Sequence, residues 1–220
     1  MIPGKYVIGV TFIQLICFLR QPPIDDTIYG NREYFQELVF SRDTFIESPW
    51  TLLSYAFSHA NWMHFIGNSS VALLVGIPIE AVDGARVLIP WALAVILGAL
   101  FHAVETPVGL VGASGGVYGL LATHAANLML NWDIKWPNSV RSIYIMVIIA
   151  LAIPPIADYI LYSGLSNTSY SAHLGGAVGG FVSGLATLRA FKNVHMGIRV
   201  CGALAAISLT TGLIIAFAYL

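Results

Sequence analysis

Long stretches without a charged residue alternate with short charged segments along the whole chain. Most of these stretches are long enough for a helix that crosses the roughly 30 Å hydrocarbon core of a bilayer, which takes about 20 residues. The pattern therefore predicts an all-α, multi-pass membrane protein. The seven stretches are 6–19, 48–79, 87–104, 106–132, 142–157, 159–188 and 200–220.

The composition strengthens this interpretation and narrows the classes of partner. The chain is 57% hydrophobic and 10% charged, whereas soluble domains carry about 25% charged residues. Its net charge of −1 gives no reason to expect nucleic acid. The two cysteines, Cys17 and Cys201, both fall in predicted spans, which favours neither a disulfide framework nor a metal site. We expect one membrane domain over residues 1–220, with the lipid bilayer as its surroundings.

Lysine and arginine divide unevenly between the two sides of the membrane when the spans alternate in direction. Cytosolic loops of membrane proteins are enriched in these residues. An N-terminus in the cytosol leaves Arg20, Arg32 and Arg42 outside and puts on the cytosolic side Lys5, Arg86, Lys135, Arg141, Arg189, Lys192 and Arg199. We therefore predict that the N-terminus lies in the cytosol. The membrane we expect is the plasma membrane or a membrane of the secretory pathway.

The longest connection between spans, roughly residues 20–50, then lies on the outer side. It contains several aromatic residues, among them Tyr34, Phe40, Phe45 and Trp50. A loop of this length usually has a function or a structure of its own. We expect short helices in it that lie partly at the membrane interface.

Three of the predicted spans begin on the outer side with polar residues among apolar ones. The second carries His59, His64 and Asn68, the fourth carries Ser114 and the sixth carries His173. Because the three spans run in the same direction, these side chains should lie at a similar depth. Polar groups inside a membrane are costly and usually face the bundle interior or a cavity, so this depth is where we predict a functional site.

Ser114 and His173 have the chemistry of a nucleophile and its base. A serine hydroxyl is a weak nucleophile until a neighbouring base takes its proton, and histidine suits that task near neutral pH. His64 and Asn68 are four residues apart and share a helix face, so both could donate to one oxyanion. Tyr118 lies on the face of Ser114, where its ring could pack against the imidazole of His173.

Glycines would let the fourth and sixth spans approach closely. Small residues four apart allow helix backbones to come together in membranes. Such contact would bring Ser114 and His173 within hydrogen-bond reach. The glycines concerned are Gly112, Gly115, Gly116 and Gly119 in the fourth span and Gly175, Gly176, Gly179, Gly180 and Gly184 in the sixth.

Structural interpretations compete with these functional ones. A single serine among glycines in a membrane helix is more often a packing residue than a catalytic one. Histidine also occurs elsewhere in the spans, at His102 and His124, and we interpret His124 as a buried structural group. Glu105 and Asp158 fall near the outer interface, and we assign them no special role.

At these residues the chain resembles the rhomboid family of intramembrane serine proteases. "GASGGVYG" (112–119) resembles the nucleophile motif of that family, "AHLGGAVGG" (172–180) its base motif, and "HANWMHFIGN" (59–68) its second-span motif. The resemblance covers roughly residues 50–190. It implies a bundle of six core transmembrane helices, with a C-terminal seventh at about residues 200–220.

The resemblance also implies roles for individual residues. Ser114 would be the nucleophile and His173 the base, in a dyad without a third acid, a metal or another cofactor. His64, Asn68 and the backbone N–H of Ser114 would form the oxyanion hole, with His59 structural and with Gly112 and Tyr118 as supporting residues of the site. One departure is visible, because many members have a Trp-Arg pair where this chain reads Pro49-Trp50-Thr51. This departure puts the contact made by that arginine in doubt.

The implied function is that of a serine endopeptidase of the eukaryotic secretase type. It would cleave the transmembrane segments of single-span membrane proteins near the outer or lumenal face. One alternative is a rhomboid-like pseudoprotease that binds membrane clients, although such relatives usually lack the serine or the histidine. Another is a small transporter with the histidines as a proton relay, which would lead us to expect acidic residues in the middle of the spans.

Overall fold

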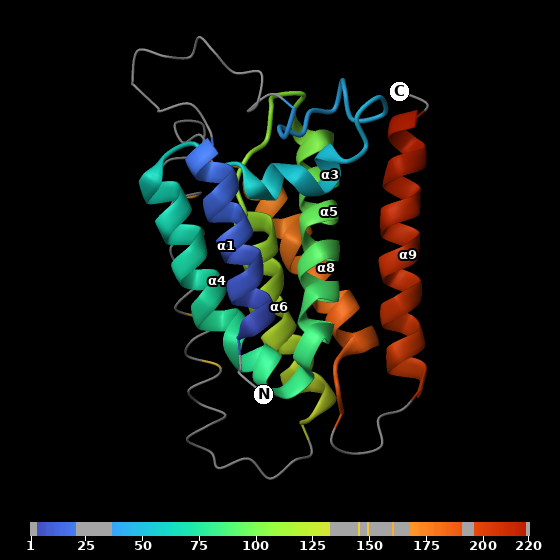
Figure 1. The fold of residues 1–220 in the computed structure, drawn as a ribbon. Coiled ribbons are helices and arrows are strands. Elements are labelled where there is room, and N and C mark those ends of the chain that lie inside the picture. Colours follow the sequence, from blue (N-terminus) through green and yellow to red (C-terminus); the bar gives the residue numbers. More distant parts are fainter. Residues whose placement is uncertain are drawn as a thin grey trace.

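The computed structural model describes residues 4–20, 37–132, 168–190 and 196–218, together with the single helical positions 145, 149 and 160. Its long helices stand side by side as a bundle (Figure 1). They are α1 (Lys5–Arg20), α4 (Trp62–Asp83), α5 (Leu88–Glu105), α6 (Ser114–Leu130), α8 (Tyr170–Thr187) and α9 (Met196–Ala218). Short elements join some of them, namely α3 (Thr51–Ser54) and the 3₁₀ helices η1 (Tyr55–Phe57) and η2 (Gly84–Val87).

The predicted all-α membrane bundle is confirmed. Within the described ranges, the helical stretches Trp62–Glu105 and Met196–Phe217 are long and apolar enough to cross a membrane, and they contain 18-residue windows with mean hydropathies of 2.3 and 2.1. The predicted fifth span, 142–157, lies outside the described residues apart from the helical positions 145 and 149. The other long helices coincide with predicted spans.

The uncharged stretch 48–79 is not one helix. It contains α3 and η1 before α4, because Ser58 adopts an extended conformation and ends η1. Asn61 then starts α4 as its N-cap, with a side chain that accepts a hydrogen bond from the His64 N–H at 2.8 Å. A stretch defined only by the absence of charge could not reveal this break.

α4, α6 and α8 all begin at the end of the bundle that lies opposite the N-terminus (Figure 1). Hydrogen bonds at both ends show this parallel arrangement. At the starts of α6 and α8, Ser114 lies beside His173, and beyond the far end of α8 the Arg189 N–H donates to Asp83 Oδ1 of α4 at 2.6 Å. The polar residues at the starts of these helices therefore share one end of the bundle.

α8 is the central helix and packs most extensively against α5 and α6. Its glycines make this possible. A Cβ on Gly176 would collide with the carbonyl oxygen of Gly115 in α6, and a Cβ on Gly180 would collide with that of Gly119. Gly179 instead faces α5, where a Cβ would lie 2.8 Å from a backbone oxygen. The expected contact between α6 and α8 is present, and α5 covers a second glycine face that the sequence did not separate from the first.

The expected short helices are present directly after this connection, as α3 and η1, whereas its described part, 37–50, contains no helix. This segment forms turns and a single β-bridge between Phe40 and Leu110. The bridge consists of two backbone hydrogen bonds, of 3.2 and 2.8 Å, and Phe40 and Phe45 are buried beneath the segment. These anchors hold the segment against the bundle without a helix. Residues 21–36 lie outside the described residues.

Candidate active site

Ser114 is the first residue of α6 and is partly buried. The chain reaches it through Gly112, whose φ of +106° is a conformation that side chains rarely adopt,. The Gly112 N–H donates to the Tyr55 carbonyl oxygen at 3.0 Å. The first N–H groups of a helix have no partner within the helix, and they carry the positive end of its dipole. Ser114 thus stands where a negative charge would be stabilised.

His173 lies in the first turn of α8 and faces Ser114. Its Nε2 is 2.9 Å from the Ser114 hydroxyl oxygen, which is hydrogen-bond distance. Its Nδ1 is buried and has no hydrogen-bond partner among the described residues. With the ring proton on Nδ1, Nε2 can accept the Ser114 proton. The pair therefore has the geometry for proton transfer from a serine hydroxyl to an imidazole.

His64 and Asn68 of α4 reach toward the loop in front of Ser114. A Cβ on Gly112 would lie 2.6 Å from His64 Nε2 and 3.5 Å from Asn68 Nδ2. Gly112 therefore has two roles. Its missing side chain leaves room for the His64 imidazole, and it can adopt a positive φ. The Nδ2 of Asn68 is buried, and the described part of the chain offers it no acceptor.

Two tyrosines surround the imidazole of His173. The Tyr118 ring stacks on it, with ring centroids 4.2 Å apart and planes 22° apart. This is the contact that the sequence predicted. Tyr170 meets the same ring edge to face at 6.3 Å, a contact that was not predicted from the sequence. Its position three residues before His173, on the same helix face, was the available signal.

His59 is fully buried in the segment between η1 and α4. Its ring packs edge to face against His64, at 5.3 Å between centroids, and also contacts Phe18 and Phe65. Neither of its ring nitrogens has a hydrogen-bond partner in the described ranges. His59 is thus part of an aromatic cluster beside His64 and does not reach the Ser114–His173 pair directly.

The segment at Pro49-Trp50-Thr51 makes contacts of its own. The Trp50 indole N–H donates to the Glu37 carbonyl oxygen at 3.1 Å, and the Thr51 hydroxyl donates to that of Ser48 at 2.7 Å. Arg42, in the preceding segment 37–50, donates to the Ala103 carbonyl oxygen of α5 at 3.3 Å.

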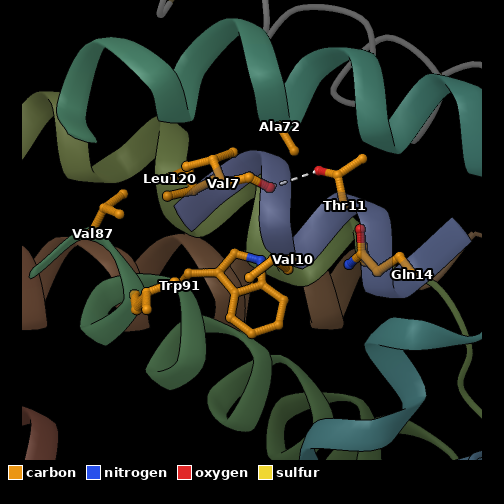
Figure 2. A pocket seen from close by; sticks show the side chains of 10 residues that line it. Val7, Val10, Thr11, Gln14, Ala72, Val87, Trp91 and Leu120 are labelled. Carbon is orange, nitrogen blue, oxygen red and sulfur yellow. Dashed lines mark hydrogen bonds between the residues drawn. The ribbon is translucent and has the colours of Figure 1, made fainter. Parts of the chain in front are cut away.

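A small cavity lies between α1 and the rest of the bundle, and neither Ser114 nor His173 lines it. Its walls come from α1, α4, η2, α5 and α6 (Figure 2). None of the residues that line it is titratable, and its polar members are Thr11 and Gln14. Thr11 donates to the Val7 carbonyl oxygen at 3.0 Å, and Gln14 donates to that of Ala56 at 3.0 Å. Among the described residues, no group of three or more histidines, cysteines or acids could hold a metal ion.

The fold and this site define a helical membrane protein with a serine–histidine pair near one end of its bundle. A family model described as the rhomboid domain matches residues 47–190. The chain therefore belongs to the rhomboid family.

Three relatives illustrate the range of this family. Rhomboid-related protein 1 of Caenorhabditis elegans is 37% identical over 145 residues, which are 63% of this chain and 40% of that protein. Rhomboid-related protein 3 of Mus musculus is 27% identical over 205 residues, 86% of this chain and 50% of that protein. Inactive rhomboid-related protein 2 of Caenorhabditis elegans is 26% identical over 136 residues, 60% of this chain and 39% of that protein. The chain spans half or less of their length, and the family includes intramembrane serine proteases as well as inactive members.

Proposed function

We propose that this protein is an intramembrane serine endopeptidase with Ser114 as its nucleophile and His173 as its general base. The observation that carries the proposal is the 2.9 Å contact between the Ser114 hydroxyl and His173 Nε2 at the start of α6. A serine among glycines needs no histidine partner to pack. A nucleophile needs one, because the base must take its proton.

The reaction begins when the Ser114 hydroxyl gives its proton to His173 Nε2 and its oxygen attacks the carbonyl carbon of a peptide bond. The carbonyl oxygen becomes an oxyanion held by the Ser114 N–H, His64 and Asn68. A donor that is buried but unpartnered, such as Asn68 Nδ2, suits a site that meets its acceptor only in the reaction. Tyr118 keeps the imidazole plane in place through ring stacking.

The C–N bond then breaks, and His173 returns its proton to the leaving amine. Water attacks the acyl group on Ser114, and His173 takes the proton of that water. The carboxylic acid leaves when the proton returns to the Ser114 oxygen. The cycle closes with every proton accounted for and uses only groups of the chain and water.

The substrates that fit this site are the transmembrane segments of single-span membrane proteins. The pair lies near the end of the bundle opposite the N-terminus (Figure 1). With the N-terminus in the cytosol, this end is the outer or lumenal face of the plasma membrane or of a secretory-pathway membrane. A substrate helix must unwind locally there, and this is costly because freed backbone groups lack partners in lipid. Helices with small or helix-breaking residues near that face would therefore be preferred.

Cleavage of co-expressed substrates tests the proposal. A panel of single-span membrane proteins is expressed with the wild type or with Ser114→Ala, and the new termini are mapped by mass spectrometry. We expect cleavage in the outer third of a transmembrane segment by the wild type alone. Equal cleavage by Ser114→Ala would contradict the assignment of the nucleophile. Binding of the panel without cleavage by either form would instead indicate a pseudoprotease.

A further inference from the structure

His102 lies in the last turn of α5 and is only 4% exposed. Both of its ring nitrogens have partners. Nε2 is 2.7 Å from the Val108 carbonyl oxygen, and Nδ1 is 2.8 Å from the Ser169 hydroxyl oxygen. Because a carbonyl oxygen can only accept, Nε2 carries a proton and donates it. In the neutral ring, Nδ1 then accepts from the Ser169 hydroxyl.

The Nε2 side of the ring holds the segment that leads to the nucleophile. Val108 belongs to the connection between α5 and α6, which ends at Ser114. Farther along the same connection, Leu110 pairs with Phe40 through two backbone hydrogen bonds. His102 therefore fixes the beginning of a segment whose end carries Ser114.

The Nδ1 side of the ring holds the start of the helix that carries the base. Ser169 is the N-cap of α8, and its hydroxyl oxygen accepts from the Ala172 N–H at 3.2 Å. Its carbonyl oxygen accepts from the His173 N–H, also at 3.2 Å. Ser169 thus binds the first turn of α8 through its side chain and its backbone, and it is itself bound to His102.

A second hydrogen bond joins the end of α5 to the start of α8, beside the one from His102. Glu105 follows His102 by three residues at the end of α5, and its carboxylate accepts a hydrogen bond from the Ser171 hydroxyl in α8. This contact of Glu105 was not predicted from the sequence. The last turn of α5 therefore holds the first turn of α8 at two points.

We propose that His102 is a positioning residue for the Ser114–His173 pair. One rigid imidazole bonds to the segment ahead of the nucleophile and to the cap of the helix that carries the base, so it sets the spacing between them. It touches neither the substrate nor the reacting atoms. This inference rests on the proposed function, because it concerns how fast Ser114 reacts.

The rate of labelling by a fluorophosphonate probe measures this spacing without a known substrate. The Ser114 oxygen attacks phosphorus and fluoride leaves, while His173 takes the serine proton. His102→Leu should lower the maximal labelling rate about 10- to 100-fold, because small misplacements of reacting groups cost that much. The half-saturating probe concentration should stay unchanged, since no residue that contacts the probe is altered.

Ser169→Ala removes the hydroxyl that bonds to His102 Nδ1 and should lower the maximal labelling rate by a similar factor. The double variant should then be no slower than the slower single variant, because the two changes break one connection. His102→Gln can still donate to the Val108 carbonyl oxygen and should fall between the wild type and His102→Leu. If His102→Leu does not accumulate as folded protein, Ser169→Ala and His102→Gln decide the question.

His124→Leu is the matched control. His124 is also a buried histidine, and its Nε2 lies 2.8 Å from the carbonyl oxygen of Val75 in α4. Its loss should lower the thermal unfolding midpoint while the labelling rate of the folded protein is kept. Equal labelling rates for His102→Leu and His124→Leu, or independent effects of His102→Leu and Ser169→Ala, would overturn the positioning role. If the wild type is labelled no faster than Ser114→Ala, the proposed function itself fails.

Discussion

α8 and α9 are both apolar helices with several glycines, yet they occupy opposite surroundings. α8 is enclosed by α5 and α6, and a Cβ on its Gly176 would collide with the backbone of α6. α9 stands at the edge of the bundle (Figure 1), with Leu204 and Ile207 57% and 62% exposed. Of its three glycines, Gly202 alone faces another backbone, the Val182 carbonyl oxygen of α8, whereas a Cβ on Gly197 or Gly212 would meet nothing within 4 Å.

The difference shows what holds a helix inside a membrane bundle. Lipid tails are as apolar as leucine, so apolar character does not decide which helix is central. Close backbone contact does, and it requires glycine only where another backbone lies opposite. In α8 that contact also brings His173 to Ser114, so the packing of α8 and the geometry of the site depend on the same residues.

The largest effect is expected for Gly176→Ala. The new methyl group would collide with the Gly115 carbonyl oxygen, one residue from Ser114, and α8 would have to move away from α6. We expect a loss of about 3 kcal/mol in the free energy of unfolding, at the upper end of overpacking costs. Unfolding in detergent measures it. A variant as stable as the wild type would show that α8 is not packed as closely as described.

A smaller loss of unfolding free energy is expected when the hydrogen bond that holds the C-terminal end of α8 is removed. Asp83 is buried and accepts the Arg189 N–H, so Asp83→Ala leaves that donor without its acceptor. We expect a cost of about 2 kcal/mol, in the range of hydrogen bonds to charged groups. Arg199 of α9 makes a comparable link to the Ala186 carbonyl oxygen from a partly exposed position. Arg199→Ala should cost about 1 kcal/mol or less. A larger loss for Arg199→Ala than for Asp83→Ala would show that α9 is held more firmly than the end of α8.

The start of α8 is tested through Tyr118, whose ring stacks on His173. Tyr118→Leu removes the flat surface that orients the imidazole, and labelling by a fluorophosphonate probe should slow about 10-fold, as expected for the loss of an aromatic pair. Tyr118→Phe keeps the ring and should keep most of the rate. Equal slowing in both variants would mean that the hydroxyl, and not the stacking, is what His173 needs.

The smallest effect is expected for Gly212→Ala in α9. Its methyl group enters open space, and alanine favours a helix more than glycine does. The free energy of unfolding should change by no more than about 0.5 kcal/mol. The same unfolding assay compares it with Gly176→Ala, and a large loss would mean that this face of α9 is covered.

The sequence predicted the helices well because charge is costly in a bilayer and therefore marks where spans end. The absence of charge alone could not place the start of α4, since the break at Ser58 involves no charged residue; the polar residues from Ser58 onward placed it within a few residues of Trp62. It identified the small residues of α8 but could not tell that Gly176 faces α6 while Gly179 faces α5. A helical period places residues on faces but does not name the neighbour on each face.

The sequence also brought Ser114 and His173 to one depth, because both stand at the starts of spans that run in the same direction. The hydrogen bonds of His102 could not be predicted from the sequence. One partner of that histidine is a backbone oxygen in a loop, and the other is the cap of a helix 67 residues away. A hydrogen bond to the carbonyl oxygen of a loop residue carries no signature in the amino-acid sequence, because every residue has that oxygen.

The Ser114–His173 pair is tested most directly by identifying the residue that a fluorophosphonate probe modifies in the purified, folded protein. We expect mass spectrometry to find the phosphonyl group on Ser114, and both Ser114→Ala and His173→Ala to abolish the labelling. Modification of a different serine, or undiminished labelling of Ser114 in His173→Ala, would contradict a Ser114–His173 dyad.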